Sequence, residues 1–180
     1  VKSRRAAQRV MASCVSYLEG KLKLRVNREK SCIGSPLKLK FLGFSLHNIK
    51  GKAGIRIHAQ SLKRFKDKIR HLTSRKLSSS ITNTLLNLRR YTTGWLGYYS
   101  IANMRNIMQE ISEWTRRRIR QIYWKQWKRI RTRQCNLVRL GIDKGQAWQW
   151  ANSRLGYWRI AGSWILSRSL TNEYLASQGY

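Results

Sequence analysis

Carboxylates, the side chains that most often hold catalytic metal ions, are few and scattered in this sequence. There are seven Asp and Glu residues, and phosphoryl transfer by two metal ions needs at least two of them side by side. Only Glu110 and Glu113 lie close, at a helical i,i+3 spacing that is more typical of a solvated helix face. We therefore expect no polymerase or nuclease active site, no metal site and no cofactor within this chain.

The histidines and cysteines are equally dispersed. His47, His58 and His71 all lie in the N-terminal half, and none has metal-ligand spacing to a cysteine. The three cysteines are far apart and form no C-x-x-C pair, which argues against a zinc ribbon and against a disulfide framework. Free, scattered cysteines indicate a reducing, intracellular compartment.

The strongest electrostatic feature is a run of positive charge at residues 116–133. No acidic residue lies between Trp114 and Asp143. A solvated helix face usually mixes signs, because Glu–Lys pairs at i,i+4 stabilise it. Like charges at this density destabilise a helix unless phosphates neutralise them, so the run predicts contact with nucleic acid.

The composition supports the same partner and a folded protein. The chain of 180 residues has 38 Lys and Arg against 7 Asp and Glu, a formal net charge of +31. Such a charge favours a polyanionic partner. The 42% of hydrophobic residues and eight Trp indicate a buried core and exclude a disordered basic tail. No segment approaches the ~18 apolar residues of a membrane span, so we expect no membrane contact.

The elements that position these residues change type along the chain. Apolar spacing predicts a helix at residues 4–19 that ends at Gly20, and Gly51 and Gly54 suit a hairpin turn. Alternating patterns predict short antiparallel strands at residues 22–27, 37–46 and 55–58.

From residue 58 the pattern is helical. Apolar stripes predict helices at residues 61–72, 81–99 and 104–133, with a linker at 74–80 and Ser80 as an N-cap. Three amphipathic helices with short connections form a bundle. Shorter helical segments follow residue 140. The fold class is therefore α+β, with an N-terminal helix and short strands followed by an all-α bundle.

The basic residues of these helices are the predicted RNA-binding residues. Ile119 and Ile122 belong to the apolar stripe of the third helix, so we expect Arg117 and Arg120 on its outer surface, away from the core. The full set is Lys63, Arg64, Lys66, Arg70, Arg116, Arg117, Arg118, Arg120, Lys125, Lys128, Arg129, Arg131 and Arg133.

Aromatic residues lie among these cations. We expect Tyr123, Trp124 and Trp127 to pack in the helical core, although aromatic rings among cations also stack on unpaired bases. For the block at residues 148–158, which holds four aromatics and Arg154, core packing and base stacking both remain open.

Four segments, taken in order, resemble one known family. They are NREKS at residues 27–31, FLGFSLH at 41–47, LLNLRRYTTGWLGYYS at 85–100 and QAWQWANSRLGYWRI at 146–160. FLGF followed at this distance by a GW-x-x-YY helix closely resembles the C-terminal part of group II intron reverse transcriptases, the intron-encoded maturases. The resemblance extends over essentially the whole chain.

The resemblance implies a division into parts. Residues 1–57 would be the end of the polymerase palm, 58–140 the thumb or domain X, and 141–180 an additional helical segment. The parent protein would be an RNA-directed DNA polymerase of the bacterial cytoplasm or an organelle matrix, with group II intron RNA, an RNA template and a DNA primer as partners. Because the sequence begins with Val1, we expect a fragment whose finger and palm part is missing.

The resemblance also implies roles for single residues. Lys30 matches the lysine that protonates the departing pyrophosphate, and Phe41, Leu42, Gly43 and Phe44 match the hairpin that positions the primer terminus. The catalytic carboxylates of the family, with their Mg²⁺, would precede Val1. We therefore expect this chain to be inactive alone while supporting splicing and DNA synthesis in its parent. The alternative is a stand-alone basic RNA-binding module without an enzymatic parent.

Overall fold

The protein is described by a computed structural model that covers residues 1, 3–49, 51–74, 76 and 79–180. The chain divides into two compact units, Val1–Ile55 and Arg56–Tyr180. The described residues are mostly helical and include a single two-stranded antiparallel sheet. This composition agrees with the predicted α+β class.

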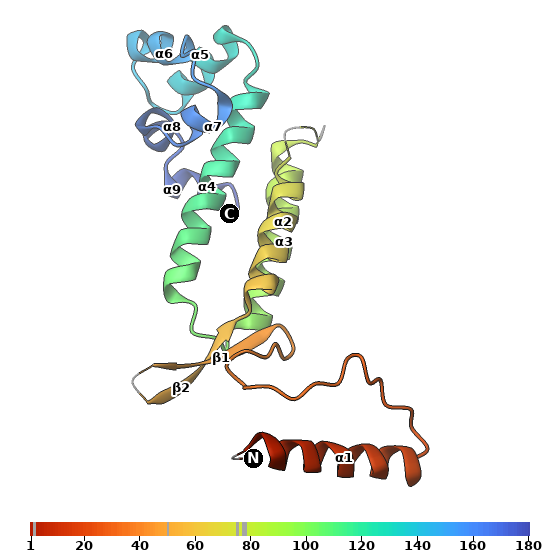
Figure 1. The fold of residues 1–180 in the computed structure, drawn as a ribbon. Helices are drawn as coiled ribbons and strands as arrows, with labels where there is room; N and C mark the ends of the chain where they lie inside the picture. Colours follow the sequence, from red (N-terminus) through yellow and green to blue (C-terminus); the bar gives the residue numbers. More distant parts are fainter. Residues whose placement is uncertain (2, 50, 75, 77–78) are drawn as a thin grey trace. The chain divides into compact units, whose positions relative to one another are not determined.

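The first unit begins with α1 (Arg4–Gly20), the helix predicted at residues 4–19 (Figure 1). Ser3 caps its N-terminus, because the Ser3 side chain accepts a hydrogen bond from the backbone N–H of Ala6 at 3.2 Å. The helix is amphipathic, yet it has no buried residue. Its apolar stripe therefore contributes little burial to this unit.

The segment after α1 does not form the strand predicted at residues 22–27. Lys23 has a φ of +54°, in the left-handed region, and this interrupts an extended backbone. Leu22 and Leu24 are exposed. An alternating segment becomes a strand only when a neighbouring strand satisfies its backbone groups, and the sheet of the described residues contains only β1 and β2.

These two strands, β1 (Phe44–Ile49) and β2 (Lys52–Ile57), form a hairpin. Gly51 has a φ of +79° in the connection, as expected for a turn glycine, while the neighbouring turn position 50 lies outside the described residues. Gly54 lies within β2, where an added Cβ would come within 2.7 Å of the His47 ring. The strand predicted at 55–58 is thus present but begins earlier, at Lys52.

A tight turn replaces most of the strand predicted at residues 37–46. Leu42 and Gly43 have φ values of +48° and +86°. Phe41 and Phe44 flank them and exchange two backbone hydrogen bonds of 2.9 and 2.8 Å. A two-residue connection with positive φ at both positions is the geometry of a type I′ turn. Only the residues from Phe44 onward continue as a strand.

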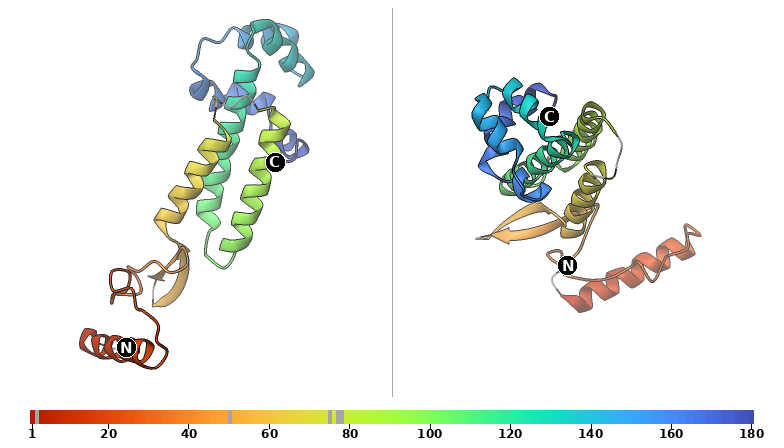
Figure 2. Two further views of the ribbon diagram at one scale, coloured as in Figure 1. Left: turned by 90° about the vertical axis from the view of Figure 1, so that its right-hand side faces the viewer. Right: turned by 90° about the horizontal axis from the view of Figure 1, so that it is seen from above.

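The second unit is built on α2 (Ala59–Leu72), α3 (Ile81–Tyr99) and α4 (Arg105–Gln126). These helices lie side by side in Figures 1 and 2. Ser80 is the predicted N-cap of α3, and its Oγ accepts a hydrogen bond from the backbone N–H of Asn83 at 3.2 Å. The linker predicted at residues 74–80 includes positions 75, 77 and 78, which lie outside the described residues.

The core of this unit joins all three helices. Phe65 of α2 stacks on Trp95 of α3 with ring centroids 4.0 Å apart. Leu88 of α3 and Ile119 of α4 are almost fully buried in the same cluster. Burial of large side chains from each helix stabilises the packing, since each contributes roughly 1.5–3 kcal/mol.

The third predicted helix, at residues 104–133, is wrong as a single element. It is two helices, α4 and α5 (Ile130–Arg139), because the backbone leaves the helical conformation at Trp127, where ψ is 55°. The Trp127 side chain is buried, and its carbonyl accepts a hydrogen bond from Arg133 Nε at 3.0 Å. Burial of Trp127 and capping of its carbonyl fix the break.

Four short helices complete the unit around the C-terminal half of α4, as Figure 1 shows. In the described residues no strand follows β2. α7 packs on α4 and α8, and α6 packs on α5. The four are α6 (Lys144–Ala151), α7 (Tyr157–Ala161), α8 (Trp164–Ser169) and α9 (Asn172–Ser177).

Candidate nucleic-acid interface

The predicted RNA-binding residues separate into an outer and an inner group. The outer group is exposed and consists of Lys63 and Arg64 on α2, and Lys128, Arg129 and Arg131 around the start of α5. Among the described residues, no hydrogen bond or ion pair engages the side chains of these five cations. We call them the exposed cations.

Charge neutralisation within the protein is small. The described residues contain two ion pairs, Arg28–Glu19 and Arg70–Asp67. Both are solvent-exposed, and such pairs typically contribute about 0–1 kcal/mol. The formal net charge of +31 is uncompensated within the chain, because 38 Lys and Arg face only 7 Asp and Glu.

Arg120 belongs to the inner group, which corrects the expectation that it lies on the outer surface. Only 9% of Arg120 is exposed. Its Nε donates to the carbonyl of Leu170 at 2.9 Å, and its Nη2 donates to Asn172 Oδ1 at 3.1 Å. Burial lowers the pKa of Arg120, and the charge of Arg116 lowers it further. This guanidinium joins α4 to the chain between α8 and α9.

Arg117 is the second inner cation. It donates from Nε and Nη2 to the carbonyl of Trp158, at 3.2 and 2.9 Å. Its guanidinium also lies over the Trp158 ring, 4.1 Å from the centroid. The contact is tight on the other side, because a Cβ added to Gly162 would lie 2.5 Å from Arg117 Cζ. Arg117 therefore anchors α7 on α4.

Arg118 and Arg133 make two further contacts between helices: Arg118 connects α4 to the end of α2, and Arg133 connects α5 to the end of α4. Arg118 reaches α2, where Nε donates to Thr73 Oγ1 and Nη2 donates to the carbonyl of Arg70 at 3.3 Å. Arg133 lies over the Trp124 ring, 4.5 Å from its centroid, besides capping the end of α4. Arginine suits this work because its planar fork presents several donors at once.

Four predicted cations, Lys66, Arg70, Arg116 and Lys125, belong to neither group. Lys66, Arg116 and Lys125 are half-buried. Arg116 Nη1 donates to Ser112 Oγ at 2.7 Å. Arg70 is exposed, pairs with Asp67 and lies 5.5 Å from the centroid of the Trp114 ring.

The aromatic residues among the cations follow the prediction of core packing. Tyr123, Trp124 and Trp127 are buried. Burial raises the pKa of Tyr123, and a hydrogen bond to Tyr174 acts in the same direction.

The aromatic block at 148–158 contains both buried and exposed rings, so core packing accounts for only part of it. Trp150 is buried against Trp164, with ring centroids 4.9 Å apart. Trp148 and Trp164 are largely exposed. The helical periodicity of a segment as short as α6 could not decide which of its tryptophans faces inward.

The residues implied as polymerase parts lie in the first unit, where Lys30, Phe41 and Leu42 are exposed and Gly43 and Phe44 are half-buried. Lys30 lies in a turn where its backbone N–H donates to Asn27 Oδ1 at 3.0 Å. Phe41 and Leu42 are 75% and 66% exposed at the tip of the tight turn. The turn conformation fixes the backbone there and leaves both apolar side chains outward.

Within the described residues, no cluster of three or more His, Cys, Asp or Glu could hold a metal ion. Glu110 and Glu113 are both exposed on α4, as the sequence indicated. Among the same described residues, none of the helices combines the length and apolar character needed to cross a membrane.

The sequence did not single out one cation that lines a cavity in the structure. Arg89 of α3 lines a cavity together with Thr92 of the same helix and Arg116 of α4. The available signal was its position one residue after Leu88, at the edge of the apolar stripe, with threonines at i+3 and i+4.

A comparison with known protein families gives a match within this helical unit. Residues 62–141 match the family model described as the group II intron, maturase-specific domain. The match to the maturase-specific domain confirms the resemblance to the C-terminal part of a group II intron maturase and indicates a maturase role in group II intron splicing. A comparison with curated proteins found no match.

The matched segment begins at Leu62 within α2 and ends at Gly141, shortly after α5. It therefore contains every predicted RNA-binding cation, from Lys63 to Arg133. The shorter helices α6 to α9 and their connections lie beyond it. They supply the acceptors of Arg117 and Arg120, which are Trp158, Leu170 and Asn172. Arg117 and Arg120 thus join the matched segment to the helices that follow it.

Proposed function

We propose that this chain is the C-terminal part of a group II intron reverse transcriptase that binds intron RNA and the template-primer, and so supports splicing and RNA-directed DNA synthesis. The observation that carries the proposal is the overlap of the exposed cations with the maturase-specific domain. A polyanion that neutralises these cations would remove the repulsion of a chain with net charge +31.

The proposal assigns residues 1–57 to the end of the palm, 58–140 to the thumb and 141–180 to an additional helical segment. The amphipathic α1, which has no buried residue, supports the first assignment. The exposed side chains of Leu22 and Leu24 support it too. An apolar stripe without cover is what a palm fragment would present to the missing finger and palm part.

In this reading the catalytic carboxylates and Mg²⁺ belong to that missing part. Lys30 would approach the pyrophosphate, and the exposed tips of Phe41 and Leu42 would approach the primer terminus. The tight turn at Leu42 and Gly43 supports a positioning role, because a defined turn sets the direction in which the Phe41 and Leu42 side chains leave the backbone.

The exposed cations would contact phosphates, whereas the inner arginines hold the helices together. This division makes RNA affinity and protein stability separable by mutation. Lys63, Arg64, Lys128, Arg129 and Arg131 are the residues whose removal should weaken RNA binding without loosening the core.

The test is the salt dependence of RNA binding. If ~6–10 phosphates are contacted, log K should fall with log[salt] at a slope of roughly −5 to −9. A transcribed group II intron RNA should compete better than an unstructured RNA of equal length. A slope shallower than about −2, or equal competition by the two RNAs, would contradict the proposal.

A further inference from the structure

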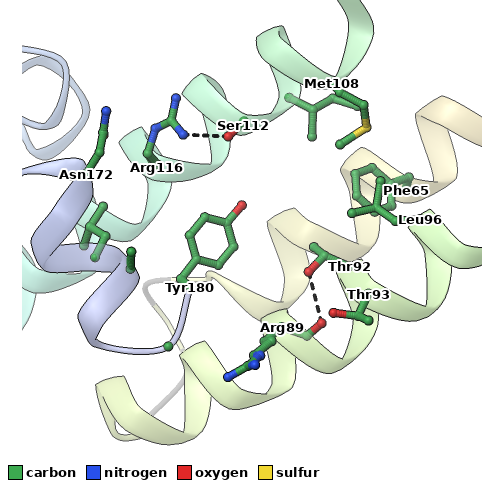
Figure 3. Close-up of a pocket in the computed structure, with 14 residues that line it drawn as sticks. Phe65, Arg89, Thr92, Thr93, Leu96, Met108, Ser112, Arg116, Asn172 and Tyr180 are labelled. Atoms are coloured by element: carbon green, nitrogen blue, oxygen red, sulfur yellow. Dashed lines mark hydrogen bonds between the residues drawn. The ribbon is translucent and has the colours of Figure 1, made fainter. Parts of the chain in front are cut away.

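A cavity of about 630 Å³ opens between α3, α4 and α9 in the second unit (Figure 3). Its size lies within the range of about 300–1,000 Å³ that is typical of small-ligand sites. Phe65, Leu96 and Ile111 contribute apolar walls. Thr92 and Ser112 contribute hydroxyl groups from α3 and α4. The cavity is therefore mixed, with one apolar side and one polar side.

Two cations line the polar side. Arg116 comes from α4, with Nη1 hydrogen-bonded to Ser112 Oγ at 2.7 Å. Arg89 comes from α3, and its Nη1 lies 3.9 Å from the position that a Cβ would take on Gly179. The lining includes no Asp or Glu. Asn172, which also lines the cavity, is held by the buried guanidinium of Arg120. The cavity is thus strongly positive without an acidic counter-charge in its lining.

An aromatic ring occupies the space between these cations. Figure 3 shows Tyr180 projecting into the cavity from the turn after α9, between α3 and α4. Tyr180 is half-buried. Burial raises the pKa of Tyr180, while a hydrogen bond to Thr115 and the charge of Arg116 oppose that shift. A flat ring with two guanidinium groups nearby is the combination that recognises an unpaired nucleotide.

We propose that this cavity takes one unpaired nucleotide of the bound RNA, with the base against Tyr180 and the apolar wall and the phosphate against Arg89 and Arg116. The proposal rests on the proposed RNA-binding function and refines it. Guanidinium groups pair with phosphate through two parallel hydrogen bonds, which favours a phosphate-bearing ligand over an apolar peptide. Base stacking on an aromatic side chain contributes roughly 1–3 kcal/mol.

The experiment compares three RNA hairpins of one stem sequence. The first carries a single bulged adenosine, the second carries an abasic bulge, and the third is fully paired. We expect the chain to bind the adenosine bulge about tenfold or more tightly than the other two. The abasic hairpin separates entry of the base into the cavity from recognition of a bent stem.

Two double variants with equal loss of charge localise the effect. Arg89→Gln with Arg116→Gln removes the cations of the cavity, and the preference for the bulged adenosine should fall to about unity. Lys63→Gln with Arg64→Gln removes two exposed cations of α2 that do not line the cavity. That control should weaken binding of all three hairpins equally and leave the preference intact. Thermal melts establish that both variants are folded.

A measurement on the unmodified chain decides the matter if a variant unfolds. A 4-thiouridine placed at the bulge should crosslink to residues of the cavity, Tyr180 above all. Crosslinks confined to other residues would overturn the proposal. So would equal affinity for the three hairpins, although the proposed function would then stand.

Loss of all RNA binding would instead refute the proposed function itself. Adenosine 5′-monophosphate supplies the last arm of the test. If it saturates the cavity while the bulge gives no preference, the site is one for free nucleotides and the RNA proposal fails.

Discussion

Arg120 offers a sharp test of the distinction between inner and exposed cations. In Arg120→Met the side chain keeps an unbranched apolar stem that reaches about as far as Arg Nε, but it loses both hydrogen bonds, to the Leu170 carbonyl and to Asn172 Oδ1. Leu170 is fully buried, so its carbonyl loses this partner in a place with little access to water.

The size of the effect follows from these contacts. Hydrogen bonds from a charged donor contribute about 1.5–3 kcal/mol each, and a buried carbonyl without a partner costs about 1–3 kcal/mol. Removal of a buried charge offsets part of this loss, because the desolvation penalty disappears with it. We expect a net destabilisation of about 2–4 kcal/mol. For a unit of this size that lowers the Tm by roughly 10 °C.

The assay is a pair of thermal melts and a pair of RNA titrations at fixed salt, with Arg131→Met as the matched control. Arg131 is exposed, so the same substitution should change stability by less than about 0.5 kcal/mol. It should also reduce the salt slope by about one. If Arg120→Met melts like the parent protein but binds RNA less tightly, its guanidinium is an RNA contact and the inner group has been misassigned.

Three further outcomes follow from the structure. Trp95→Ala removes the ring that stacks on Phe65 and should destabilise the helical unit by about 3–5 kcal/mol. RNA affinity measured well below the melting temperature should stay unchanged. Weaker RNA binding at unchanged stability would instead make Trp95 an RNA contact. The chain alone should extend no primer with Mg²⁺ or Mn²⁺, and addition of the missing finger and palm part should restore extension, so nucleotide incorporation by the chain alone would refute the assignment. Burial raises the pKa of Tyr123 above the value of about 10 for an unfolded tyrosine; the folded state then keeps a proton that the unfolded state releases. The free energy of unfolding should therefore fall as pH rises above about 10, and Tyr123→Phe should reduce that dependence in melts across this range.

The sequence by itself determined the properties that depend on composition and local spacing. The excess of cations and the scarcity of carboxylates follow from the composition alone and need no knowledge of the fold. The helices α1, α2 and α3 and the cap at Ser80 were predicted because periodicity and capping act within a few residues along the chain. The order of four short segments was sufficient to indicate the family that the match over residues 62–141 confirms.

Tertiary structure decided what depends on residues far apart in the chain. A hydrophobic stripe could not show that Arg120 points inward, because the Leu170 carbonyl that receives it is 50 positions away. The helix break at Trp127 depends in the same way on burial of that side chain in the folded unit. The alternating residues 22–27 form no strand because strand formation needs a neighbour to satisfy the backbone. Periodicity identifies a face, but only the assembled fold supplies the carbonyls and rings against which each side chain on that face is placed.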